Sequence, residues 1–176
     1  MPRYLRRLIG VVALDAGAYE DVEGDPTATL HAGVTVVLSS MSAGFGTTRL
    51  WAEPPSVWSL ATIALLAWAC WALVTFEVGA RLLPGRRTHS DVGELLRTLG
   101  FASSPGLLLA LGALPGLAVP VVALVTLWMT VTMIVAVRQA LDYESTARAV
   151  AVCVLGWTLT IAIVFLVGSL ATPALA

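Results

Sequence analysis

The chain has 176 residues, of which 58% are hydrophobic and only 12% are charged, and its formal net charge is −1. Soluble domains carry about 25% charged residues, so this chain has too few charged groups to cover a soluble surface. Several uncharged stretches reach about 20 residues, the length that spans a hydrocarbon core, and they predict an all-α polytopic membrane protein. The roughly ten-residue alternating segments of a membrane β-barrel are not found. The net charge says nothing about partners, and we expect no nucleic-acid partner.

The first 25 residues are expected to form a cytoplasmic segment. Residues 2–14 place apolar side chains at helical spacing, and Arg3, Arg6 and Arg7 crowd the first turns. This stretch is too short to span a bilayer. It predicts either a basic amphipathic helix in the membrane interface or a simple topology anchor for the first span. Residues 15–25 are acidic and polar.

Five spans are predicted in the membrane domain, residues 26–176. Asp25 and Pro26 provide a helix start, with Asp as the N-cap and Pro at the first helical position. Small residues in the first span, such as Gly33 and Gly44, suit close helix contact. The spans are residues 27–45, 57–78, 99–114, 117–137 and 149–170.

A second interfacial amphipathic helix is predicted at residues 91–100, where apolar side chains recur at helical spacing on one face. It leads into the shortest span, residues 99–114, which reaches only about 24 Å against a core of about 30 Å. Four residues that weaken helices interrupt this span: Ser103, Ser104, Pro105 and Gly106. A lipid-facing gap in backbone hydrogen bonding costs several kcal/mol. We therefore expect neighbouring helices to cover the break, with serine hydroxyls satisfying the freed carbonyls.

Arginine positions favour five crossings. With five spans and a cytoplasmic N-terminus, nine of the ten arginines face the cytoplasm and only Arg49 lies outside. If residues 99–114 form a re-entrant segment instead, Arg138 and Arg148 move outside and the bias weakens. We predict an integral protein of the bacterial cytoplasmic (inner) membrane, with the C-terminus outside.

Five ionisable residues in or beside the spans are candidates for function. Glu77 and Arg81 are spaced i,i+4, as are Arg138 and Asp142. Each pair is either a proton or cation site or an ion pair at the membrane boundary, and we favour the ion pairs. His31, one turn into the first span, is expected to be a hydrogen-bonded interfacial residue rather than a ligand.

Enzyme signatures are missing, so we predict a protein without catalytic activity or cofactor. The chain has no paired His/Glu metal motif, no G-x-S-x-G and no phosphate loop. Cys70 and Cys153 both lie inside apolar runs, which favours buried free thiols over a disulfide or metal site.

Four stretches around the spans share patterns of Gly, Pro and Arg: YEDVEGDPTAT (19–29), TFEVGARLLPG (75–85), LLRTLGFASSPGLLLALGALPG (95–116) and VRQALDYESTARAV (137–150). These stretches resemble the Yip family of five-span membrane proteins, named for Ypt/Rab-interacting proteins, and in particular its bacterial-type members. The resemblance implies a helical membrane domain with a cytosolic N-terminus, and it carries over no catalytic residue. Eukaryotic members are associated with vesicle traffic, Rab-type GTPases and membrane shaping. Their acidic Asp-Leu-x-Gly-Pro element and long N-terminal region are missing here, which argues against GTPase binding.

Our leading hypothesis is a membrane scaffold, adaptor or accessory subunit of a larger membrane assembly. It would contact membrane lipids and other membrane proteins, or associate with itself. The alternative is a small transporter or channel that uses polar groups of the first and second spans, His31 and Glu77 among them.

Overall fold

The computed structural model describes residues 1–84 and 91–171, and every regular element within these ranges is helical. The seven α-helices are α1 Arg3–Val12, α2 Ala16–Glu23, α3 Ala28–Gly46, α4 Val57–Phe76, α5 Val92–Ala102, α6 Ala118–Ala140 and α7 Thr146–Ala171. Two 3₁₀ helices, η1 and η3, cover Thr48–Leu50 and Ser104–Ala113, and a π-helix, η2, covers Glu77–Leu82.

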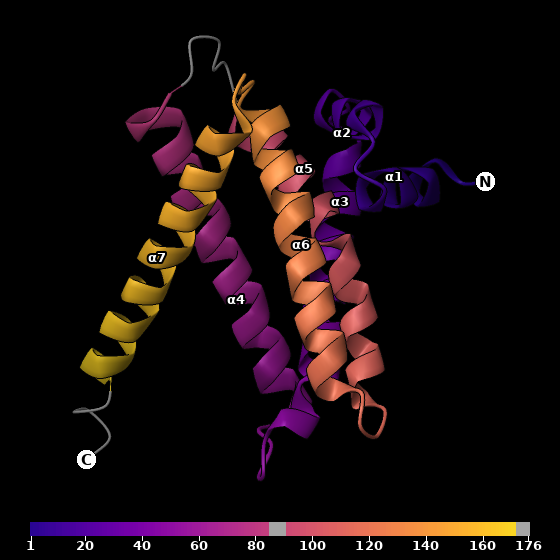
Figure 1. Cartoon of the computed structure of the whole chain (residues 1–176), viewed down its shortest axis with the longest axis vertical. Coiled ribbons are helices and arrows are strands. Elements are labelled where there is room, and N and C mark those ends of the chain that lie inside the picture. Colours follow the sequence, from indigo (N-terminus) through magenta and orange to yellow (C-terminus); the bar gives the residue numbers. More distant parts are fainter. Residues whose placement is uncertain (85–90, 172–176) are drawn as a thin grey trace.

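Five helical stretches are long and apolar enough to cross a membrane, which confirms the predicted fold class of an integral membrane protein. Successive stretches run in opposite directions, so α1, α2 and the end of α6 lie at one end of the molecule and the last turn of α7 at the other (Figure 1). The stretches are Ala28–Leu50, Val57–Leu82, Val92–Ala113, Ala118–Ala140 and Thr146–Ile163.

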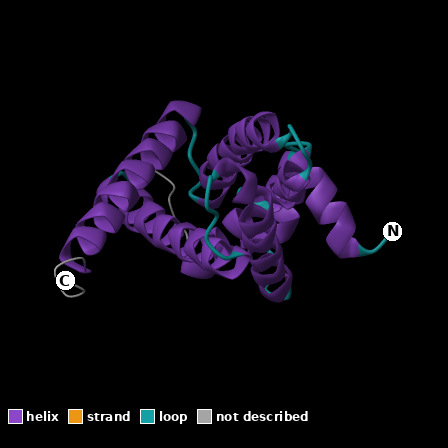
Figure 2. Ribbon diagram, turned by 90° about the horizontal axis from the view of Figure 1, so that it is seen from below, coloured by secondary structure: helices purple, strands orange, loops and turns teal. Residues whose placement is uncertain are grey.

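The central bundle consists of α3, α5, η3 and α6, which pack on one another. Helices α4 and α7 cross each other beside this bundle (Figures 1 and 2). At their crossing Trp71 stacks on Trp157, with ring centroids 5.4 Å apart. Helix α1 lies across the bundle near one end, with α2 beside it (Figure 1).

The third span differs from the prediction in length and in surroundings. Residues 91–100 were expected on the membrane surface, but Val92–Ala102 continues into η3 as one stretch of 22 residues. Leu95 and Leu99 are fully buried against the bundle. An apolar helix face has the same spacing whether lipid or another helix covers it, so periodicity alone did not distinguish the two.

The helix break at residues 103–106 lies inside the bundle. Ser103 and Ser104 are 1% and 4% exposed, and Pro105 and Gly106 are also buried. From Ser104 onward the chain winds as the 3₁₀ helix η3. The hydroxyl of Ser103 donates to the carbonyl three residues before it, at 2.6 Å.

A threonine from a neighbouring helix hydrogen-bonds a carbonyl that the break leaves without its helical donor. In an α-helix the Ala102 carbonyl would accept from the N–H of Gly106, but that N–H donates to the Ser103 carbonyl at 2.9 Å. Pro105 has no N–H to offer. The hydroxyl of Thr132 on α6 donates to the Ala102 carbonyl at 2.7 Å.

Glycines allow the closest helix contacts. A Cβ placed on Gly100 of α5 would lie 2.8 Å from the Cβ of Ala32 on α3, too close for two carbons. A Cβ on Gly44 would lie 2.6 Å from the Val57 carbonyl at the start of α4. Gly33 faces open space, with nothing within 4 Å of such a Cβ. Of these three glycines, Gly100 and Gly44 therefore serve close contacts within the chain, whereas Gly33 does not.

Candidate functional site: the hairpin docked on the bundle

Residues 1–25 fold into a hairpin of two helices. Helix α1 ends where Leu14 takes a left-handed φ of 61° and the Asp15 N–H donates to the Gly10 carbonyl at 2.9 Å. The Asp15 carboxylate then accepts from the Gly17 N–H at 3.0 Å and caps α2. The two caps reverse the chain and place α2 along α1.

Helix α2 lies within residues 15–25, where the sequence indicated only an acidic and polar segment. Its buried residues, Tyr19 and Val22, are three positions apart and face the bundle. Asp15 as an N-cap, followed by these two apolar residues at helical spacing, was the signal in the sequence. The segment is short and mostly polar, so this signal is weak.

Four charged residues hold the hairpin together. The Arg7 guanidinium, only 3% exposed, lies 2.8 Å from the Asp21 carboxylate and 2.6 Å from that of Asp25. Arg3 pairs with the same two carboxylates at 2.8 Å and 3.2 Å. Hydrogen bonds from Arg7 and then Arg3 lower the pKa of Asp21 to about 2. Hydrogen bonds from Thr27, which has the larger effect, and from Arg7 hold the pKa of Asp25 well below its usual range.

Tyr4 attaches the hairpin to the start of the first span. Its ring stacks on His31 with centroids 5.0 Å apart and an interplanar angle of 22°. Its hydroxyl lies 3.0 Å from the hydroxyl of Thr35, one turn farther along α3. The structure therefore places His31, a candidate from the sequence, in a packing contact at the base of α1.

Two further hydrogen bonds attach the hairpin to α6. The buried Tyr19 hydroxyl lies 3.1 Å from the Thr132 carbonyl and 3.2 Å from the Val11 carbonyl. Burial raises the pKa of the Tyr19 phenol well above its ordinary value, so it stays a neutral donor. The indole N–H of Trp128 donates to the Val12 carbonyl at 3.1 Å.

The end of α2 is docked on α5 and faces other carboxylates. The Arg97 guanidinium donates to the Glu23 carbonyl at 2.6 Å and 3.2 Å. The Glu23 side chain is half-buried in a cleft of about 260 Å³ that Glu20 and Asp142 also line. Burial, and next the negative charge of Asp142, raise the pKa of Glu23 to about 7.

The structure forms one of the two predicted ion pairs. Glu77 and Arg81 pair at 2.9 Å at the end of α4, where both side chains are exposed. Arg138 and Asp142 do not pair, because α6 ends at Ala140 and Asp142 takes a left-handed φ of 50°. Arg138 donates instead to the Tyr143 carbonyl at 3.3 Å and to the Thr146 hydroxyl at 3.2 Å.

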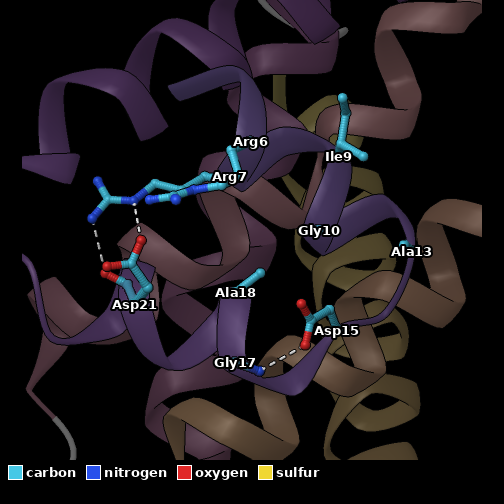
Figure 3. Close-up of a pocket in the computed structure, with 9 residues that line it drawn as sticks. All are labelled: Arg6, Arg7, Ile9, Gly10, Ala13, Asp15, Gly17, Ala18 and Asp21. Atoms are coloured by element: carbon cyan, nitrogen blue, oxygen red, sulfur yellow. Dashed lines mark hydrogen bonds and ion pairs between the residues drawn. The ribbon is translucent and has the colours of Figure 1, made fainter. Parts of the chain in front are cut away.

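A cavity of about 460 Å³ lies between α1 and α2 (Figure 3). The ion pair of Arg7 with Asp21 lies at one end of this space, and Asp15 with its cap lies at the other (Figure 3). The residues that line it are Arg6, Arg7, Ile9, Gly10, Ala13, Asp15, Gly17, Ala18 and Asp21.

Residues 1–84 and 91–171 contain no group of three or more His, Cys, Asp or Glu side chains placed to hold a metal ion. Cys70 and Cys153 are free thiols. Outside the spans, the described residues form a docked amphipathic helix with paired charges and a cavity beside it. Such an arrangement suits contact with lipids or proteins.

A family model described as the Yip1 domain matches residues 18–168, most of the chain. The match begins within α2 and extends into the last helix, so it includes all five candidate spans and the break between α5 and η3. No curated protein and no solved structure matches the chain. By its five apolar helices and this match, the chain is an integral membrane protein that belongs to the Yip1 domain family.

Proposed function

We propose that this protein is a non-catalytic membrane scaffold that inserts α1 into the cytoplasmic leaflet and acts through contact with lipids and other membrane proteins. The observation that carries the proposal is the position of α1. It lies across the bundle near one end (Figure 1), and besides pairing with α2 it is hydrogen-bonded to α3 and α6 and packs on α5.

Three sides of α1 face three environments. Because an α-helix turns about 100° per residue, residues two positions apart lie on nearly opposite sides. Arg3 and Arg7 face α2, whereas Leu5 and Ile9 lie on the opposite side and are 44% and 55% exposed. Leu8, between them, is buried against the bundle. The exposed apolar pair is therefore directed away from α2, toward the depth at which lipid chains would lie.

The arginine distribution supports the proposed orientation. The end of the molecule that carries α1 and α2 also carries the end of α6 and the start of α7 (Figure 1). These segments contain Arg138 and Arg148, whereas Arg49 lies in η1, which follows α3 at the other end. Loops rich in arginine favour the cytoplasmic side. We therefore place the hairpin in the cytoplasm, α1 in the interface and the C-terminus outside a bacterial inner membrane.

Depth measurements with spin labels test the insertion of α1. In a background with both cysteines replaced by alanine, single labels at positions 5 and 9 are compared with one at Glu20, an exposed residue of α2. We expect the first two labels to lie at acyl-chain depth and the third in water. If all three lie in water, α1 is not inserted and the proposal fails.

A double variant, Leu5→Gln with Ile9→Gln, tests whether insertion matters for the scaffold. Both side chains are exposed in the structure, so folding should be unaffected. We expect the wild type to remodel small vesicles and the variant to lose this activity. Solute flux that depends on His31 or Glu77 would instead support a transporter.

A further inference from the structure

We propose that the cavity between α1 and α2 binds the headgroup of an aminophospholipid, with the phosphate on Arg6 and the ammonium on Asp15. This inference rests on the proposed insertion of α1 and names the lipid that the inserted hairpin would recognise. The ligand chemistry is a phosphate ester that carries a primary ammonium group.

Two charges of opposite sign are left over in the cavity. Arg7 and Asp21 neutralise each other through their ion pair. Within the described residues the Arg6 side chain has no hydrogen bond or ion pair, and it is exposed. Asp15 uses one carboxylate oxygen, Oδ1, for the cap of α2, which leaves Oδ2 beside Gly10. A cation and an anion therefore remain free to bind a ligand.

The small side chains around these charges leave room for a headgroup. Gly10, Ala13, Gly17 and Ala18 line the cavity, and its volume of about 460 Å³ is in the range of small-molecule sites. A Cβ on Gly10 would lie 2.5 Å from the Cβ of Ala18, so the two helices already touch at this point. The cavity is partly open at the surface.

The cavity lies next to the apolar pair of α1. Arg6 and Ile9 are three positions apart, so they lie on neighbouring parts of the helix surface, away from the bundle. Ile9 belongs both to the cavity lining and to the exposed apolar pair. A phospholipid is an amphiphile with this arrangement, because its charged headgroup lies directly above its acyl chains. This continuity favours a lipid over a soluble phosphate ester.

A headgroup with both charges fits better than a purely anionic one. An anionic phospholipid such as phosphatidylglycerol offers the same phosphate to Arg6, but its uncharged glycerol has no ammonium group to compensate the Asp15 carboxylate. A choline headgroup has a quaternary nitrogen without N–H donors for the Asp15 carboxylate. The ethanolamine headgroup supplies the phosphate for Arg6 and three N–H donors for Asp15.

Native mass spectrometry of the intact protein, released from neutral detergent, tests the assignment. The protein is titrated with phosphatidylethanolamine, phosphatidylglycerol and phosphatidylcholine. We expect phosphatidylethanolamine to bind best. We also expect Arg6→Gln to weaken its binding about tenfold or more, as for the loss of a charge-assisted hydrogen bond. Equal binding of the three lipids by the wild type would overturn the proposal.

Two variants separate the site from general effects of charge and folding. Asp15→Asn keeps an N-cap of similar strength, so α2 should remain folded while the preference for phosphatidylethanolamine over phosphatidylglycerol disappears. Arg49→Gln removes an exposed arginine that likewise has no described partner, at the other end of the molecule, and should leave binding unchanged. An unchanged preference in Asp15→Asn, or equal losses in Arg49→Gln and Arg6→Gln, would contradict the assignment.

Soluble phosphoethanolamine distinguishes the two sources of this chemistry. If it displaces the lipid at similar concentrations, the ligand is a free phosphate ester and the lipid assignment fails. The spin-label depths keep this inference separate from the scaffold proposal. If the labels lie at acyl-chain depth but the protein shows no lipid preference, only the headgroup site is refuted. If the labels lie in water, the scaffold proposal is refuted.

Discussion

Replacing Thr132 by valine tests how the fold accommodates the break in the third span. Valine keeps the shape of the side chain but removes the hydroxyl that donates to the Ala102 carbonyl at 2.7 Å. That hydroxyl also lies 2.9 Å from the carbonyl of Met129, but its single proton serves one acceptor at a time. Thr132 is fully buried, so water does not replace the lost donor.

The expected cost follows from two limits. Interhelical hydrogen bonds in membrane proteins contribute about 0.6 kcal/mol on average, with a maximum of about 1.7 kcal/mol. Leaving a buried acceptor without a partner costs about 1–3 kcal/mol. The N–H that would serve the Ala102 carbonyl in an α-helix donates to Ser103 instead, which places this site toward the upper limit. We expect Thr132→Val to destabilise the fold by about 1–2 kcal/mol.

Thermal unfolding in detergent micelles measures this cost, and a loss of that size lowers Tm by about 2–8 °C. Thr130→Val is the matched control. Thr130 lies on the same helix, but its hydroxyl donates to the carbonyl of Thr126, within its own helix, at 2.9 Å. If the two variants unfold at the same temperature, the hydroxyl of Thr132 does not support the break and the reasoning is refuted.

Four other substitutions give further tests, each checked by unfolding in the same micelles. Thr75→Val removes a fully buried hydroxyl that has no hydrogen-bond partner among the described residues, so stability should stay constant or rise; a loss as large as that of Thr132→Val would contradict this. Gly100→Ala forces a methyl group against Ala32 and should cost about 1–3 kcal/mol, whereas Gly33→Ala should stabilise by up to about 1 kcal/mol. The Glu23 pKa of about 7 lies above its ordinary 4.5, so the folded state holds its proton longer and stability should fall as pH rises between these values. Because this side chain is half exposed, solvent screening limits the effect to about 1–2 kcal/mol, and Glu23→Gln should abolish it in unfolding curves at pH 5 and pH 8.

The candidate site was only partly predictable from sequence. The basic amphipathic helix at the N-terminus was predicted at residues 2–14 and forms at Arg3–Val12. Its partners were not predicted, because the ion pairs of Arg7 join residues 14 and 18 positions apart, and such separations follow no helical period. The bond between Tyr19 and Thr132 joins residues 113 positions apart. Only the packed structure brings these groups together.

The two pairs predicted from i,i+4 spacing show why local rules succeed or fail. Glu77 and Arg81 share a continuous helix, so their spacing places them on one face and they pair. Arg138 and Asp142 have the same spacing, but the helix ends between them. The left-handed conformation of Asp142 then directs its side chain elsewhere. Spacing predicts contact only as far as the helix extends.

The sequence by itself determined that this is a membrane protein with five helical spans. The thickness of a bilayer sets a length requirement that four of the apolar stretches meet locally, and the arginine distribution favours a crossing for the short third stretch. The tertiary structure decided what covers each apolar face. The face of residues 92–99 is buried by neighbouring helices, whereas Leu5 and Ile9 on α1 remain exposed. The spacing of apolar residues shows that one face of a helix must be kept from water. Contact with lipid and contact with another helix both achieve this, so the spacing does not distinguish them. The choice between them depends on the arrangement of the whole bundle.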